Sequence, residues 1–224
     1  MTETTLRPTA IAAAIMAEIA DPALLIRELN HRVKNNFQII LSLMHLRKRM
    51  LPSDRRGDTR FIEDHMQAMS VAYRLVYATG SIADIAPAEL VADVMSGLRQ
   101  TAGLDEDRLR VEVTSGETAI GLDHALALAL YLAIKLPPYL DNATASGGTV
   151  AVTLAGVGEL LTLSVVAPRA ERGDFDVLRT RLMQAYATQL NGRIVPANGQ
   201  NPAQLEFIPV RFVPAAALSL GCLL

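Results

Sequence analysis

The stretch that decides the fold lies near the N-terminus and reads ELNHRVKNNFQIILSL from residue 28 to residue 43. It is part of a longer run, residues 21–50, whose apolar side chains recur at steps of three and four residues. They are Ile26, Leu29, Val33, Phe37, Ile40 and Met44. This spacing is typical of a long amphipathic helix. Asp21 and Pro22 favour a helix start, and Pro52 ends the run.

A second helical pattern follows after a short loop. Its apolar positions again recur at steps of three and four before Gly80 breaks the pattern: Ile62, Met66, Met69, Tyr73 and Val76. Two long helices joined by a short loop predict an antiparallel hairpin over residues 21–80. A hairpin alone leaves its apolar seams exposed, so we expect it to pair with a second copy as a four-helix bundle in a homodimer. The alternative is that it packs against the remainder of its own chain.

Composition excludes several classes of protein. The chain has 224 residues, 50% of them hydrophobic, and 21 Lys and Arg against 23 Asp and Glu, for a net charge of −2. This balance predicts a folded core and leaves no basic excess for nucleic acid. Cys222, the single cysteine, forms no internal disulfide. No apolar run reaches the about 20 residues that span a membrane. We therefore expect a soluble, cytoplasmic protein without nucleic-acid or membrane partners.

Alternating elements after Pro87 predict a second domain, so the fold class is α+β with helices over one face of a mixed sheet. We expect helices at 87–101, 122–136 and 174–190, and strands at 108–114, 149–154, 160–166, 193–195 and 205–212. The domain prediction is an N-terminal extension at 1–20, the hairpin at 21–80, the α/β domain at 86–214 and a tail at 215–224.

The first helix also carries a polar stripe opposite its apolar seam: Arg27, His31, Lys34, Asn35, Gln38, Ser42 and His45. A neutral imidazole has a nitrogen lone pair near physiological pH and can attack phosphorus directly. Arg27, Arg32 and Lys34 would gather phosphoryl oxygens, and Asn35 would donate its amide or orient a water. By composition alone this stripe is more typical of a solvated helix face than of a reactive site.

The ordered string His-Arg-x-Lys-Asn, followed by Phe-Gln and Ser-Leu, resembles the phosphoacceptor motif of the HisKA_2 (HWE-related) sensor histidine kinases of bacterial two-component signalling. The resemblance implies that His31 is phosphorylated, that Arg32, Lys34 and Asn35 are its motif companions, and that Glu28 orients the imidazole.

The same resemblance extends to residues 66–77 and implies that response-regulator receiver domains are the partners. Arg27, Phe37 and Gln38 are the expected receiver contacts. Tyr73 stands where that family usually has a histidine.

In such kinases the second domain binds ATP. Here the sequence resembles that domain in the order of its elements but lacks its nucleotide-binding motifs. The segment that resembles the magnesium-binding N-box is Tyr131–Pro138, which contains neither a carboxylate nor an asparagine. Asp141 and Asn142 follow it, and we interpret them as turn formers. The adenine-binding Asp-x-Gly-x-Gly is replaced by residues 166–173, and the glycine-rich lid by residues 173–178 with two aspartates.

The sequence therefore predicts a histidine phosphotransferase with a degenerate ATPase-like domain. His31 would relay a phosphoryl group between receiver aspartates, with no cofactor of its own and Mg²⁺ supplied by the receiver. Two alternatives stay open: an ATP-dependent histidine kinase, and a pseudokinase scaffold or receiver phosphatase. His45, His65 and His124 lack motif partners and read as structural or merely exposed, and no Cys/His spacing predicts a metal site.

Overall fold

The computed structural model describes seven single residues of the first helix and four longer ranges. They are Arg32, Val33, Asn35, Ile40, Ser42, Leu46 and Arg49, then residues 60–114, 118–167, 176–198 and 202–210. The chain divides into two compact units, Met1–Gly57 and Asp58–Leu224. Each of the seven single residues has helical backbone, in agreement with the first predicted helix.

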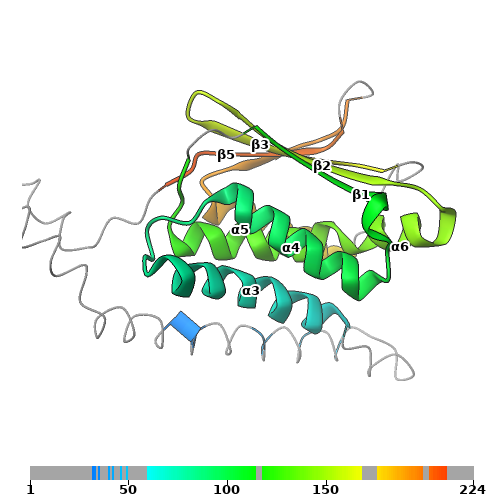
Figure 1. Ribbon diagram of the computed structural model, residues 1–224, viewed down its shortest axis with the longest axis horizontal. Helices are drawn as coiled ribbons and strands as arrows, with labels where there is room; N and C mark the ends of the chain where they lie inside the picture. The colour runs from blue at the N-terminus through cyan, green and yellow to red at the C-terminus, as the bar shows by residue number, and fades with distance from the viewer. Residues whose placement is uncertain are drawn as a thin grey trace, which may run out of the picture. The chain divides into compact units, whose positions relative to one another are not determined.

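The second unit contains a five-stranded mixed sheet (Figure 1). Its strands are β1 (Leu109–Thr114), β2 (Val150–Val157), β3 (Leu160–Val166), β4 (Arg193–Val195) and β5 (Gln204–Phe207), in the order β1-β2-β3-β5-β4. The β1 and β2 strands are parallel and all other pairs are antiparallel. The predicted hairpin around Gly158 is confirmed, with β2 running three residues further than expected and β5 ending earlier, at Phe207.

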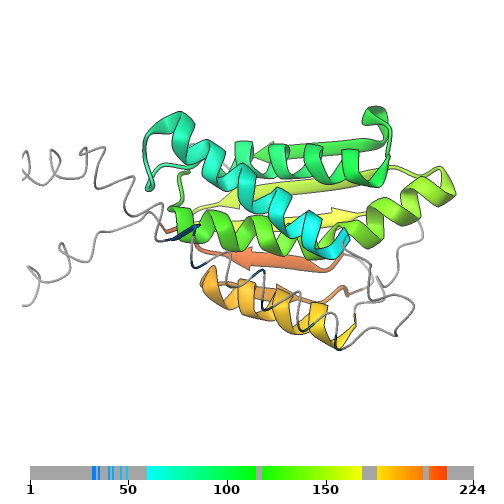
Figure 2. The same cartoon turned by 90° about the horizontal axis from the view of Figure 1, so that it is seen from below.

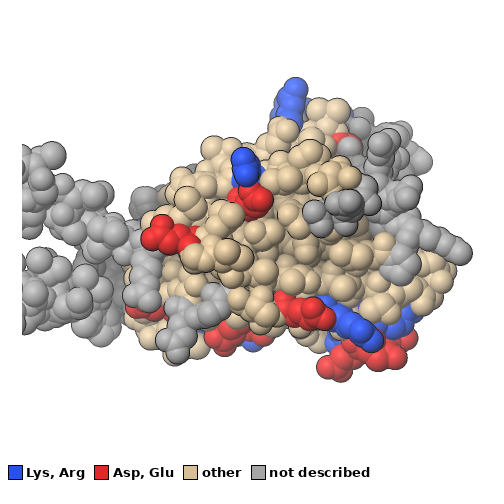
Figure 3. Space-filling view, turned by 90° about the horizontal axis from the view of Figure 1, so that it is seen from above, with Lys and Arg blue, Asp and Glu red and all other residues tan. Residues whose placement is uncertain are grey.

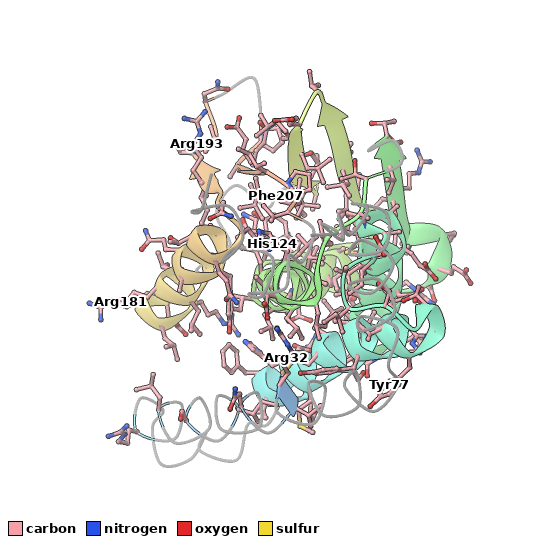
Figure 4. The ribbon with its side chains drawn as sticks, turned by 90° about the vertical axis from the view of Figure 1, so that its left-hand side faces the viewer. Arg32, Tyr77, His124, Arg181, Arg193 and Phe207 are labelled. Carbon is pink, nitrogen blue, oxygen red and sulfur yellow. The ribbon has the colours of Figure 1, made fainter. Side chains whose placement is uncertain are left out.

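The helices lie on one face of this sheet, as predicted. They are α3 (Arg60–Thr79), α4 (Pro87–Ala102), α5 (Leu122–Lys135), α6 (Pro137–Ser146) and α7 (Val177–Gln189), with a 3-10 turn, η2, at Glu106–Arg108. Among them α5 is central, because α4 and α7 flank it and α3 crosses it on the side away from the sheet (Figures 1 and 2). Phe207 reaches the core from the inner face of β5 and is fully buried (Figure 4).

Proline sets the boundary between α5 and α6. The chain carries Pro137 and Pro138 directly after Leu136, and α5 ends at Lys135 as expected. A proline removes a backbone donor and disfavours helix before it, yet it fits the first turn of a new helix. The two prolines therefore stop one helix and begin the next.

Helix α3 packs against the α/β elements of its own chain, which is the alternative that the sequence left open. Its inner face buries Ala68, Ala72 and Leu75 against α5 and α4. Gly97 of α4 allows a close approach, because a Cβ there would lie 2.7 Å from the side-chain nitrogen of Gln67. An ion pair between Arg74 and Asp93, 2.8 Å long, joins the same helices. The dimeric four-helix bundle stays a prediction.

The turn after α7 depends on two residues. Asn191 adopts a positive φ of 52° just beyond the helix, a conformation that asparagine tolerates better than most residues. Gly192 comes next, and a Cβ at this position would lie 2.4 Å from the carbonyl oxygen of Glu206. Glycine is therefore required here so that the chain can enter β4 directly beside β5.

Candidate functional site

The predicted phosphoacceptor segment is described only in part. Arg32 is half-buried and Asn35 is exposed, both on helical backbone. Ser42, seven residues after Asn35, is also exposed, whereas Ile40 of the apolar seam is buried. These residues follow the predicted division into a polar and an apolar face. The other predicted site residues lie outside the described residues: His31, Lys34, Glu28, Arg27, Phe37 and Gln38.

Tyr131–Pro138, the segment that resembles the N-box in sequence, lies within the described residues and is mostly apolar. Every side chain from Tyr131 to Pro137 is buried. Burial raises the pKa of Tyr131 above its ordinary value. Lys135 is only 6% exposed, and its Nζ lies 5.1 Å from the centroid of the Tyr139 ring. Buried core side chains therefore occupy the positions at which the sequence resemblance would place oxygen ligands for Mg²⁺.

These residues do not fit a magnesium nucleotide. Mg²⁺ requires oxygen ligands, usually carboxylates together with phosphates and waters. The segment Tyr131–Pro138 offers leucine, isoleucine, alanine and proline around one buried cation. Transfer from ATP would therefore lack its metal ligands at this segment.

Asp141 and Asn142, interpreted above as turn formers, lie instead within helix α6. That interpretation was wrong because α6 begins directly at the two prolines and leaves no loop for these residues to turn. Asp141 forms an ion pair with Arg60 of α3, with 2.8 Å between the guanidinium Nη2 and Oδ1. Its carboxylate thus joins α6 to α3.

The first turn of α7 is occupied by side chains of this chain. Asp176 caps the helix by accepting a hydrogen bond of 2.8 Å from the backbone N–H of Arg179. The guanidinium of Arg179 lies 5.8 Å from the ring centroid of Phe61 on α3. Residues 168–175, which include the first half of the predicted lid, lie outside the described residues.

Together these contacts form a cluster where the N-terminal end of α3 meets α6 and α7. We call it the clasp, and it consists of Arg60, Phe61, Asp64, His65, Asp141 and Arg179. His65 is 1% exposed, its Nδ1 donates to the carbonyl of Phe61 at 2.6 Å, and its ring lies 4.3 Å from that of Phe61. The clasp joins the N-terminal end of α3 to α6 and α7, while α3 packs against α5.

Two ionisable groups of the clasp are buried at a cost. Burial raises the pKa of Asp64 to about 6, although Arg60 partly opposes this shift. Burial lowers the pKa of His65 to about 4, so this histidine is neutral at physiological pH. Among the described residues, Oδ1 of Asp64 and Nε2 of His65 have no hydrogen-bond partner. A buried polar atom without a partner costs about 1–3 kcal/mol.

We predict that the effect of Asp64→Asn on the free energy of unfolding depends on pH. The substitution should be more favourable for stability at pH 7 than at pH 4. The pKa of Asp64 rises from 3.8 to about 6 on folding. Between these values the Asp64 carboxyl is deprotonated in the unfolded state but still protonated in the folded state. The free energy of unfolding of the wild type therefore falls by up to about 3 kcal/mol as the pH rises from 4 to 7. Urea unfolding of the wild type and of Asp64→Asn at several pH values measures this difference. The contribution of His65, which rises with pH, is present in both proteins and cancels in the comparison. A difference independent of pH would contradict the assignment.

The sequence did not identify the clasp. The spacing of Arg60 and Asp64 by four residues was a visible signal for a helical ion pair. The pairing of Arg60 with Asp141, 81 residues away, and of Phe61 with Arg179 depends on the tertiary fold.

The described residues offer neither a metal-ion cluster nor a membrane-spanning helix. In that part of the chain, no group of three or more His, Cys, Asp or Glu side chains is placed to hold a metal ion. None of its helices is long and apolar enough to span a membrane. His124, at the start of α5, is half-buried and lies 3.5 Å from the side-chain nitrogen of Asn191 (Figure 4).

Comparison with known proteins confirms the resemblance that the sequence suggested. Residues 28–102 match the family model HisKA_2, described as histidine kinase. The histidine kinase domain of the EL346 blue-light activated histidine kinase from Erythrobacter litoralis has a TM-score of 0.58 and 17% identity, over 87% of this chain and 96% of that one. A second structure of the EL346 kinase gives 0.56 and 17%, over 83% and 62%. At such identity the likeness shows a shared fold. No curated protein is a significant match.

Proposed function

We propose that this chain, whose residues 28–102 match the HisKA_2 histidine kinases, is a histidine phosphotransferase of two-component signalling. His31 would accept a phosphoryl group from the aspartyl phosphate of one receiver domain and pass it to the aspartate of another. The chain itself would bind no ATP. The receivers would supply Mg²⁺ and both aspartates.

One observation carries this proposal. The matched region retains the whole His-Arg-x-Lys-Asn string, whereas the segment in place of the N-box buries apolar side chains and is crossed by α3. Phosphoryl transfer from ATP depends on charge neutralisation by Mg²⁺ and on oriented donors. A relay needs only the imidazole, because the receiver brings the metal and the leaving carboxylate.

Transfer from the receiver aspartyl phosphate to His31 needs no further reactant. Neutral His31 attacks the phosphorus of the acyl phosphate, and the P–O bond to the receiver aspartate breaks as the P–N bond forms. The aspartate leaves as a carboxylate, and the imidazole keeps its other ring nitrogen protonated. Arg32, Lys34 and Asn35 would hold the phosphoryl oxygens during transfer. Glu28 would orient the ring, and Arg27, Phe37 and Gln38 would contact the receiver.

The proposal is tested by offering two phosphoryl donors to the wild-type protein. We expect label from a ³²P-phosphorylated receiver to appear on this chain, and label from γ-³²P-ATP to stay at background over the same time. Labelling from ATP alone would establish the kinase alternative. Faster loss of the receiver phosphate with no label on this chain would establish a receiver phosphatase.

A further inference from the structure

The outer face of the sheet carries an exposed apolar row at the β2–β3 hairpin. Val157 pairs with Leu160, and Leu161 pairs with Phe207, which places Ile208 beside Leu160 in the continuing register. Side chains alternate along a strand, and Leu161 and Phe207 point into the core. Val157, Leu160 and Ile208 therefore share the outer face, where they are 80%, 37% and 47% exposed.

The row is bordered by one charged pair on this face, because Glu206 lies opposite Thr162 and forms an ion pair of 2.8 Å with Arg193. Ala155 and Thr162, the next outward pair toward the sheet centre, are small and half-buried. Figure 3 shows this face, on which a few charged side chains, among them one blue and red pair inside the outline, are separated by uncharged surface. Val210 adds a further side chain that is 38% exposed. We call Val157, Leu160, Ile208 and Val210 the hairpin patch. Val157, Leu160 and Ile208 are neighbours in the strand register, and neighbouring exposed apolar side chains favour a binding surface more than single scattered ones do.

The chain leaves the described residues immediately beside this patch. The carbonyl of Val210 accepts a hydrogen bond of 3.0 Å from the backbone N–H of Gly121, which fixes where the following segment starts. Residues 211–224 read RFVPAAALSLGCLL and are apolar except for Arg211, Pro214, Ser219 and Gly221. A segment tethered three residues from Ile208 has an effective concentration on the order of millimolar or higher at the patch.

We propose that residues 211–224 bind to the hairpin patch of their own chain. Both surfaces are apolar, and the contact removes both from water. The charges are also complementary, because the exposed Glu159 lies at the hairpin turn between Val157 and Leu160, and Arg211, of opposite charge, begins the segment. This contact completes the outer face of the sheet and does not involve the phosphoacceptor helix.

Cys222 provides the test, because it is the only cysteine of the chain. Val157→Cys places a second thiol in the patch, and Arg110→Cys places a matched thiol on the exposed β1 edge strand. We expect a short bis-maleimide to give an intramolecular crosslink in the full-length Val157→Cys protein with at least a tenfold higher yield than in Arg110→Cys. Adding Leu160→Asp to Val157→Cys should lower this yield at least fivefold, and Cys222→Ser should abolish it.

Three outcomes would overturn the proposal. Equal yields from the two thiols would show that the segment does not prefer the patch. Covalent dimers in place of crosslinked monomers would make a second copy the occupant. A fluorophore on Cys222 that responds only to vesicles of phosphatidylcholine and phosphatidylglycerol, without a crosslink, would assign the segment to lipid. None of these readouts depends on phosphoryl transfer, so the proposed function is tested separately.

Discussion

Replacing His31 with alanine should lower the label received from a phosphorylated receiver by about 100-fold or more, to the background of the assay. The reason is chemical, because no other residue of the predicted motif offers a neutral nitrogen nucleophile at physiological pH. Lysine and arginine side chains are hydrogen-bond donors with no acceptor lone pair, and the amide of Asn35 is not nucleophilic. The measurement is the yield of ³²P on this chain after a fixed time with excess phosphorylated receiver.

His45→Ala is the matched control for this experiment. His45 lies fourteen residues after His31 on the same predicted polar stripe but lacks the motif residues around it. We expect this variant to accept label within about twofold of wild type, as a surface substitution away from the site should. Full labelling of His31→Ala, or equal losses in both variants, would contradict the assignment of His31. The label should also be lost in acid and retained in alkali, as is usual for a phosphoramidate.

Replacing Gly192 with alanine should destabilise the protein by about 3 kcal/mol, a value typical of overpacking at a tight site. The added Cβ would lie 2.4 Å from the backbone oxygen of Glu206, 2.7 Å from Cβ of Phe207 and 3.1 Å from its Cα. Two of these atoms belong to the backbone of β5, so a side-chain rotation cannot relieve the clash. The strand and the buried Phe207 must shift together.

Thermal unfolding measures this prediction, with an expected fall in Tm of about 6–12 °C for a protein of this size. Gly158→Asn is the matched control, because Gly158 has a φ of +61° and nothing lies within 4 Å of an added Cβ. Asparagine tolerates this conformation, so we expect a loss below about 1 kcal/mol. A Gly192→Ala protein as stable as wild type would show that β5 adjusts freely at this turn.

Most of the α/β fold was predictable from local signals. Pro137 and Pro138 ended α5 where expected, glycines marked the β2–β3 turn, and the steps of three and four residues identified α3. Strand ends were less accurate, because pairing decides where a strand stops: β2 continues to Val157, which has a partner in Leu160, and β5 ends with its partner at Phe207. Asp141 was misread because a helix can restart directly at a proline.

The candidate site divides in the same way. The order of residues around His31 carried the phosphoacceptor prediction, and the composition of Tyr131–Pro138 carried the prediction of a lost nucleotide site. Neither the order of residues around His31 nor this composition could show which surface α3 packs against. Its apolar positions suit a second helix of a bundle or the face of α5 equally well, since both present aliphatic surface.

The sequence by itself determined the helical periods, the turns and the chemistry available at His31, because these depend on residues close together along the chain. Only the tertiary structure decided that α3 lies across α5 and that Arg60 meets Asp141 while Arg179 meets Phe61. Such contacts join residues about 80 to 120 positions apart, and their partners are fixed by how the buried surfaces pack, which no local pattern encodes.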